Sequence, residues 1–296
     1  MAKTLKEKQE QFIPRIIPSP TQADKEKLLK YIKEGDKILE ISAGSTQLTQ
    51  SILNKFDNIH ITAVDSSPEG IEKILEKVDF YPDKVKLSDV DFLNFITRDK
   101  YDVIIFCSSI HEILSYTERN GKRYDLNIIG KIMRKACELL KPGGRILIRD
   151  TVASDIAHKI TLQFKDKTLE KLANIYIKDF TGFPMEIRKT GVGYVMSYNA
   201  MAEMLYAIMW GEEELPKEAR KFKTYFSLKD WEDLSFYTDK YYGVKLKESF
   251  EYLQKEYEGK LEGKVKIYSS IPENPSRKLI PLPNSNAIVV FEKAEK

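Results

Sequence analysis

Two acidic residues stand where predicted β-strands end, and each is followed by a turn of small residues. Glu40 lies in the apolar run 37–41, which leads into the sequence SAGST before a helical pattern begins. Asp65 follows the apolar run 59–64 in the same way. Small residues let a ligand approach the backbone and reach the N–H groups of a helix N-terminus. Both turns are therefore candidate ligand-binding sites.

A histidine follows another predicted strand. The chain contains only 3 histidines, and His111 comes shortly after the run 101–107. Imidazole titrates near neutral pH, so this side chain can orient a substrate or take its proton. Asp150 ends the next run, 145–149. We predict His111 and Asp150 as catalytic residues; the alternative for the histidine is a helix cap or core residue.

These side chains require a framework that brings strand ends together. Apolar runs predict five strands, each coupled to a helical pattern, at 37–41, 59–64, 85–87, 101–107 and 145–149. Continuous apolar strands imply burial on both faces, hence a parallel sheet covered by helices. Such sheets bind ligands at the carboxyl ends of their strands. Two late runs, 265–268 and 287–291, predict a hairpin-like pair that completes the sheet.

The alternation of strands and helices stops after Asp150. Residues 151–263 read mainly as helices and loops, with many aromatic and methionine side chains and both tryptophans. Such side chains can close over a flat or apolar substrate, or can form the core of the insert itself. For the first interpretation we select Tyr194, Tyr198 and Met204 as substrate contacts.

The predicted fold class is α/β: a Rossmann-like, mostly parallel seven-stranded sheet with helices on both faces and a largely helical insert after strand five. The predicted divisions are a helical N-terminal segment, a ligand-binding α/β core, a mainly helical insert or cap, and the final strands that complete the sheet: 1–35, 36–150, 151–263 and 264–296.

Composition excludes several classes of protein. The 48 basic and 45 acidic residues are spread along the 296-residue chain and give a net charge of +3, which argues against a nucleic-acid partner. Only 2 cysteines occur, so neither a disulfide framework nor a cysteine metal site is expected. No apolar run approaches the roughly 18 residues needed to cross a bilayer. We expect a cytoplasmic protein with no membrane contact.

The order of acid, small-residue loop and second acid resembles class I S-adenosylmethionine-dependent methyltransferases, over residues 36–150 and the two late strands. Serine and threonine stand here where that family usually has glycine. The resemblance implies S-adenosylmethionine as cofactor, with Glu40 near its methionine amino group and Asp65 on its ribose hydroxyls. Asp89 is assigned to the adenine, and Asp91 competes for that role. The full implied cofactor site is Glu40, Ser42, Ala43, Gly44, Ser45, Thr46, Asp65, Ser66, Asp89, Val90, Cys107 and Ser108.

The resemblance also implies methyl transfer to a small or medium-sized acceptor, through an oxygen, nitrogen or carbon nucleophile. Glu112 and Arg149 join Tyr194, Tyr198 and Met204 as acceptor contacts. An ion pair between Arg149 and Asp150 is an equally good interpretation of the arginine. Metal-dependent relatives place an acid after strand four and an Asp-Asn pair after strand five. This chain has Cys107-Ser108 and Asp150-Thr151 there, so no catalytic metal is expected.

Three alternatives stay open from the sequence. An NAD(P)-dependent oxidoreductase would use the same sheet and an acid like Asp65, but the first turn retains only the middle glycine of the G-x-G-x-x-G pattern. The others are a non-catalytic methyltransferase-like binding module and an RNA methyltransferase. Lys217, Lys221 and Lys223 beside aromatic residues could contact a phosphate backbone, but the surrounding acidic residues favour a solvated helix face of mixed charge.

Overall fold

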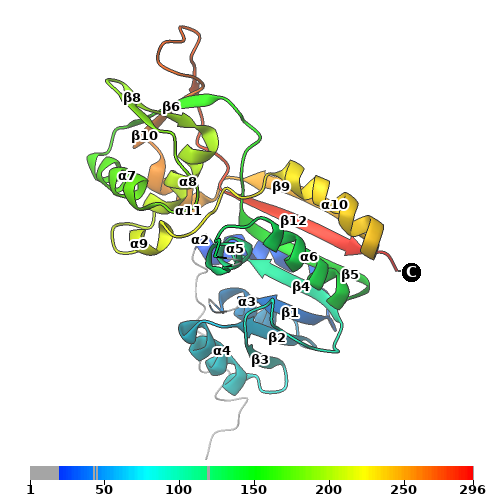
Figure 1. The fold of residues 1–296 in the computed structure, drawn as a ribbon. Coiled ribbons are helices and arrows are strands. Elements are labelled where there is room, and N and C mark those ends of the chain that lie inside the picture. Colours follow the sequence, from blue (N-terminus) through cyan, green and yellow to red (C-terminus); the bar gives the residue numbers. More distant parts are fainter. Residues whose placement is uncertain (1–19, 43, 45, 119–120, 296) are drawn as a thin grey trace, which may run out of the picture.

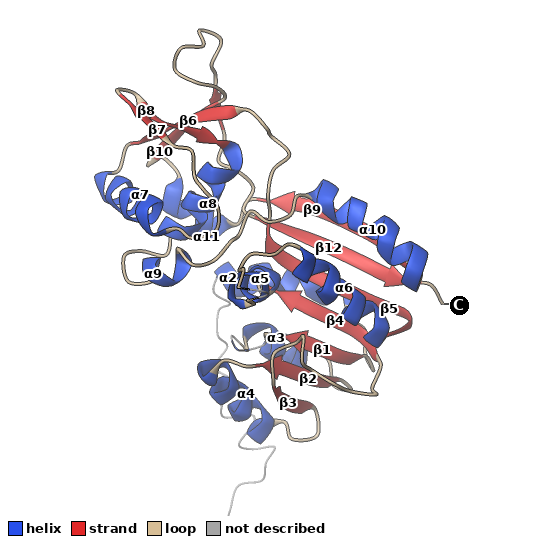
Figure 2. Ribbon diagram, viewed as in Figure 1, coloured by secondary structure: helices blue, strands red, loops and turns tan. Residues whose placement is uncertain are grey.

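The chain folds into two lobes (Figures 1 and 2). The computed structural model describes residues 20–42, 44, 46–118 and 121–295. The larger lobe is built on one sheet and the smaller lobe on a second. The first described elements are α2 (Pro20–Lys25) and the 3₁₀ helix η1 (Glu26–Tyr31). They lie in the predicted N-terminal segment 1–35, of which residues 1–19 fall outside the described residues.

The large lobe contains a seven-stranded sheet of order β3-β2-β1-β4-β5-β12-β9. All neighbouring pairs from β3 to β5 are parallel, and β12 runs antiparallel to both β5 and β9. The predicted mostly parallel seven-stranded sheet is therefore confirmed. Its strands are β1 (Lys37–Ile41), β2 (His60–Asp65), β3 (Val85–Asp89), β4 (Tyr101–Cys107), β5 (Leu140–Thr151), β9 (Val244–Tyr252) and β12 (Asn286–Lys293).

The central strands are apolar along their whole length because each face of the sheet is covered. In β4, Ile104 and Phe106 belong to one hydrophobic cluster, whereas Val103 and Ile105 belong to the cluster on the opposite face. Side chains alternate between faces along a strand, so both sets need apolar residues. One cluster is covered by α5 (Ile110–Tyr116), α6 (Asn127–Leu139) and α10 (Leu228–Tyr242), and the other by η1 and α3 (Gln47–Lys55). Helix α4 (Pro68–Phe80) packs against β2 and β3.

The small lobe is organised around a sheet that the sequence analysis did not predict. This second sheet has five strands in the order β11-β10-β6-β8-β7, and every pair is antiparallel. The strands are β6 (Lys159–Phe164), β7 (Arg188–Thr190), β8 (Gly193–Ser197), β10 (Val265–Tyr268) and β11 (Leu279–Ile280). The accompanying helices are α7 (Lys167–Asp179), α8 (Tyr198–Ile208), α9 (Leu215–Glu218) and α11 (Lys255–Leu261).

One strand assignment from the sequence is wrong. Strand β10 pairs with β6 and β11 in the small lobe, so it does not form a hairpin with β12. The partner of β12 is β9, an edge strand that alternates charged and apolar residues and carries no continuous apolar run. The boundary predicted between 263 and 264 is corrected accordingly: α10 and β9 return to the large lobe before α11, β10 and β11 add to the small one.

Candidate active site

The carboxyl ends of the parallel strands border a cleft of about 850 Å³. We call it the donor cleft. Its walls come from the turns after β1, β2 and β4 and from the start of α5, as expected for a ligand site in a parallel sheet. The lining residues already named from the sequence are Ser42, Gly44, Asp65, Ser66, Asp91, Cys107, Ser108 and Glu112.

Asp65 joins the first two turns of this cleft. One carboxylate oxygen, Oδ1, accepts hydrogen bonds from the backbone N–H and the hydroxyl of Ser67, at 2.8 and 2.7 Å. The other, Oδ2, accepts the N–H of Gly44 at 2.9 Å and keeps capacity for a ligand hydroxyl. The turns touch so closely that a Cβ on Gly44 would lie 2.7 Å from the Cα of Gly70. Glycine is required at this contact.

The turn after β1 is held in a conformation that L-residues seldom adopt. Ser42 and Thr46 have φ angles of 55° and 49°, in the left-handed region. A β-branched residue there is an outlier, and such outliers cluster at ligand-binding sites. Ser42 lines the donor cleft, whereas Thr46 lies at the start of α3 outside its lining. Ala43 and Ser45 lie outside the described residues.

Glu40 is buried behind the cleft wall. Its side chain is 3% exposed, and its Oε2 accepts the hydroxyl of Thr49 at 2.7 Å. Burial raises the pKa of Glu40 to about 7, although Thr49 and the charge of Lys25 act in the opposite direction. Glu40 is thus a carboxyl group balanced between its two protonation states near neutral pH.

Of the two acids considered for the adenine in the sequence, only one lines the donor cleft. Asp89 and Val90 do not line the donor cleft, but the competing candidate Asp91 does, together with Leu93 and Asn94. Strand β3 ends at Asp89, and Asp91 lies in the turn that follows it. Asp91 accepts hydrogen bonds from the backbone and side-chain amides of Asn94, so it also shapes the turn.

His111 and Asp150 form a buried pair where α5 begins. The Nδ1 of His111 lies 2.6 Å from Oδ1 of Asp150, while Oδ2 accepts the backbone N–H groups of Ile110 and His111 at 2.9 and 3.2 Å. An ionised carboxylate only accepts, so Nδ1 carries the proton and the neutral ring keeps a lone pair on Nε2. Burial lowers the pKa of His111, but the charge and hydrogen bond of Asp150 raise it to a value above its usual range. Burial alone would raise the pKa of Asp150, but the charge and the hydrogen bond of His111 outweigh the effect of burial and lower this pKa.

Arg149 pairs with a different acid from the one considered in the sequence. Its guanidinium contacts Asp24 of α2, through Nε at 2.9 Å and also through Nη2, and both side chains are almost fully buried. Nη1 donates to the hydroxyl of Ser108. The interaction fixes α2 against the carboxyl end of β5. The alternative of an Arg149–Asp150 ion pair is corrected, because Asp150 faces His111.

A second cleft of about 220 Å³ lies between the two lobes. We call it the acceptor cleft. It shares Lys25, Ser108 and Glu112 with the donor cleft, so the two adjoin. The large lobe contributes His111 and Arg149 to its lining. The small lobe and residues 219–226, which follow α9, contribute Tyr206, Met209, Trp210, Glu218, Lys221, Lys223 and Tyr257.

The three substrate contacts chosen from the insert are corrected. Tyr194, Tyr198 and Met204 belong to the hydrophobic core of the small lobe and do not line the acceptor cleft. The hydroxyl of Tyr194 is held within the lobe by Glu170 and Asn174. Helix α8 is buried on all sides, so no amphipathic pattern in its sequence marks the residues that face a ligand. The cleft is lined instead by Tyr206, in the last turn of α8, and by Met209 and Trp210, which follow the helix.

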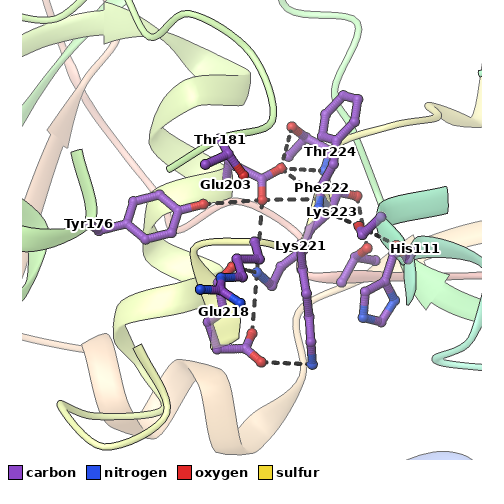
Figure 3. Close-up of polar contacts among 12 residues, drawn as sticks. His111, Tyr176, Thr181, Glu203, Glu218, Lys221, Phe222, Lys223 and Thr224 are labelled. Carbon is purple, nitrogen blue, oxygen red and sulfur yellow. Dashed lines mark hydrogen bonds and ion pairs between the residues drawn. The ribbon is translucent and has the colours of Figure 1, made fainter. Parts of the chain in front are cut away.

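The segment 221–224 connects the small lobe to helix α5, which carries His111 (Figure 3). The fully buried carboxylate of Glu203 accepts the backbone N–H groups of Lys223 and Thr224, at 2.9 and 2.6 Å. On the other side, the N–H of Phe222 donates to the Ser115 hydroxyl, which in turn donates to the carbonyl of His111. The segment also brings Lys221 into a double ion pair with Glu112 and Glu218, each at 2.9 Å.

No group of three or more His, Cys, Asp or Glu side chains that could hold a metal ion occurs in the described part of the chain. Within residues 20–42, 44, 46–118 and 121–295, no helix is long and apolar enough to cross a membrane.

Comparisons with known proteins find a similar domain and similar folds. Residues 39–146 match a family model described as a methyltransferase domain. No curated protein matches the chain. Among solved structures, the CcbJ methyltransferase from Streptomyces caelestis has 13% identity and a TM-score of 0.50, covering 94% of this chain and 90% of that one.

Two further structures resemble the chain at TM-scores of 0.47. A methyltransferase from Clostridium acetobutylicum, described as S-adenosylmethionine-dependent, has 14% identity and covers 98% of both chains. An O-methyltransferase family 2 protein from Planctomyces limnophilus, solved with apigenin, has 15% identity; the match covers 88% of this chain and 50% of that one. The chain therefore spans about half of the length of that protein. Residues 39–146 thus resemble a methyltransferase domain, and they lie within the mostly parallel sheet of the large lobe.

Proposed function

We propose that the protein transfers a methyl group from S-adenosylmethionine to an oxygen or nitrogen nucleophile of a small acceptor, without a metal ion. The observation that carries the proposal is the His111–Asp150 pair: His111 lines the acceptor cleft, which adjoins the donor cleft, and Asp150 holds the Nδ1 of its ring. A histidine with a free ring nitrogen and an orienting carboxylate is the arrangement of a general base.

The described residues fit the proposed cofactor. The donor cleft is within the usual size range of small-molecule sites, and small residues such as Ser42, Gly44 and Ser108 leave its wall open to a ligand. Asp65 retains acceptor capacity for a hydroxyl, and Glu40 places a carboxyl group behind the turn after β1. When bound, S-adenosylmethionine would supply a methyl group already activated on a sulfonium ion.

The chain's own residues then have simple tasks. His111 takes the proton from the acceptor nucleophile through Nε2, and Asp150 orients the ring and stabilises the imidazolium that forms. The acceptor cleft of about 220 Å³ limits the acceptor to a small molecule. Met209 and Trp210 offer apolar surface to the acceptor, and alignment of the two ligands supplies most of the rate enhancement.

Activity is tested by incubating the protein with S-adenosylmethionine and a panel of small phenols and amines, and by measuring S-adenosylhomocysteine by mass spectrometry. We expect acceptor-dependent product with at least one compound. Because the proposed reaction uses no metal, EDTA should leave the rate unchanged. Loss of activity with EDTA and its recovery with Mg²⁺ would show that the proposed metal-independent mechanism is wrong.

Cofactor affinity should depend on pH through Glu40. The pKa of this carboxyl is about 7 in the free protein because of burial, and a ligand ammonium nearby would favour its ionised form. Below pH 7, where Glu40 is mostly protonated in the free protein, binding must release the proton of this carboxyl. Affinity should therefore drop by up to about tenfold per pH unit below pH 7 and level off above it.

Calorimetric titration with S-adenosylhomocysteine from pH 5.5 to 8.5 measures this dependence. The Glu40→Gln variant, which cannot ionise, should bind more weakly at pH 8 and with a much flatter pH profile. Equal slopes for the variant and the original protein would remove Glu40 from the site.

A further inference from the structure

One hydroxyl group of the acceptor cleft has no hydrogen-bond partner. Tyr257 of α11 lines this cleft and is only 1% exposed. Its phenolic oxygen is buried and makes no hydrogen bond within the part of the chain that the structure describes. A buried polar group without a partner is costly in free energy, so its presence in the wall of a ligand-sized cleft calls for an explanation.

The other hydroxyl groups of the cleft are engaged by the protein itself. The ring centroid of Tyr206 lies 5.4 Å from that of Tyr257, and the Tyr206 hydroxyl can donate to the carbonyl of Val152 or Asn284. The remaining hydroxyls of the lining also make hydrogen bonds within the protein; they belong to Ser108, Thr151 and Ser285.

The position of the Tyr257 hydroxyl also sets it apart from other unpartnered groups. The described residues contain 6 buried side-chain polar atoms without a hydrogen bond, and only Tyr257 among their residues lines the donor or the acceptor cleft. A ligand in the acceptor cleft is therefore placed to satisfy this group.

Tyr257 is a hydrogen-bond donor at neutral pH. Burial, together with the neighbouring Tyr206, raises the pKa of Tyr257 well above its ordinary value, so the phenol stays protonated. A protonated phenol has one O–H to donate. The matching atom of a ligand is one with a free lone pair.

The charges of the cleft favour an uncharged ligand atom. Arg149, Lys221 and Lys223 line it, and each is already paired with a carboxylate of the protein. A ligand carboxylate would compete with these ion pairs, whereas a neutral oxygen would leave them intact.

The apolar part of the lining favours a flat ligand that can reach the Tyr257 hydroxyl. Aromatic rings of Tyr206 and Trp210 and the side chain of Met209 contribute to it. Because the hydroxyl is closed to solvent, a ligand reaches it by displacing side chains of the lining, and methionine is the most adaptable apolar side chain for such a movement.

Resting on the proposed function, we propose that Tyr257 selects the methyl acceptor, by donating a hydrogen bond to an uncharged oxygen on a flat molecule whose nucleophile faces His111. Both residues line one cleft of about 220 Å³, so a single small molecule can contact both. The acceptor class is thus an aromatic alcohol or amine that carries a second, neutral oxygen, with a ketone as the simplest case. Tyr257 lies outside residues 39–146, which match the methyltransferase domain.

The test compares phenols that differ in one oxygen atom. In meta- and para-hydroxyacetophenone a ketone carbonyl stands where meta- and para-ethylphenol have a methylene group. The original protein should have a higher kcat/KM for a ketone than for its ethyl counterpart, and Tyr257→Phe should reduce this ratio roughly 5–50-fold because the donated hydrogen bond is lost. Comparison of the ratio between variants removes the difference in intrinsic reactivity between the two phenols.

Tyr194→Phe is the matched control for selectivity. It removes a hydroxyl that is held by Glu170 and Asn174 in the core of the small lobe, away from the cleft, and should leave the ratio unchanged. No preference for the ketones in the original protein, or an unchanged ratio in Tyr257→Phe, would overturn the assignment.

A second measurement needs no acceptor. Tyr257→Phe should not lower the melting temperature, since its hydroxyl has no partner to lose, whereas Tyr206→Phe should lower it by roughly 2–4 °C. An equal decrease in both variants would show that the protein itself binds the Tyr257 hydroxyl, against the proposal.

The failure of this inference can be told from failure of the proposed function. If the protein binds S-adenosylhomocysteine in calorimetry but methylates neither ketone, the assigned acceptor class is wrong and the proposed function stands. If it does not bind S-adenosylhomocysteine, the proposed function itself fails.

Discussion

The His111→Ala variant should lose roughly 10²–10⁴-fold in kcat while keeping its affinity for S-adenosylhomocysteine within about twofold. The reason is geometric: Nδ1 of the ring is held at 2.6 Å by Asp150, so only Nε2 can accept a proton from the acceptor. His111 does not line the donor cleft, and its removal leaves cofactor contacts in place. Acceptor-dependent turnover and calorimetry measure the two quantities.

The pH profile separates a base from a structural residue. Because the charge of Asp150 raises the pKa of His111 above its usual value, the rate should fall as pH decreases through that raised pKa, where the ring becomes protonated. Asp150→Asn removes the charge and should move this inflection to lower pH. His158→Ala, on an exposed loop, is the control and should leave the profile unchanged. A His111→Ala variant with normal kcat and reduced stability would make the pair a helix cap.

The Glu203→Ala variant should lose about 3–5 kcal/mol of unfolding free energy, as expected when a buried, hydrogen-bonded charge is removed from its partners. Its carboxylate is 0% exposed and accepts the N–H groups of Lys223 and Thr224 and the hydroxyl of Thr224. Without it, two backbone donors are buried unsatisfied. Urea denaturation followed by fluorescence measures the loss.

Glu212→Ala provides the matched control in the same lobe. Glu212 forms an exposed ion pair with Lys171, and such pairs contribute about 0–1 kcal/mol. The segment 221–224 links Glu203 to His111 through Ser115, so Glu203→Ala should also increase hydrogen exchange in that segment. Equal stability of the two variants would show that Glu203 does not hold the segment in place.

The main sheet was predictable because strand burial leaves a strong sequence signal. Apolar residues fill β4 on both faces, and the acids at the ends of β2 and β5 follow from the rule that ligands bind at carboxyl ends of parallel strands. Asp65, His111 and Asp150 were selected in this way. The sequence could not choose between Asp89 and Asp91 near the third strand, because the end of a strand is less well marked than its centre; of the two, only Asp91 lines the donor cleft.

Other features leave little signal in the sequence. Strand β9 alternates charged and apolar residues as an edge strand does, so it was absorbed into the predicted insert. Helix α8 is buried all around, and its pattern cannot tell Tyr198 in the core from Tyr206 at the acceptor cleft. Tyr257 is one of 16 tyrosines in the chain, and only its tertiary neighbours distinguish it from a core residue.

The most direct test of the central claim is a calorimetric titration of the protein with S-adenosylhomocysteine and, separately, with NAD⁺. A class I methyltransferase site predicts saturable binding of one S-adenosylhomocysteine per chain and no detectable heat from NAD⁺ at the same concentrations. Saturable binding of NAD⁺ without binding of S-adenosylhomocysteine would contradict the proposed cofactor and return the oxidoreductase alternative to first place.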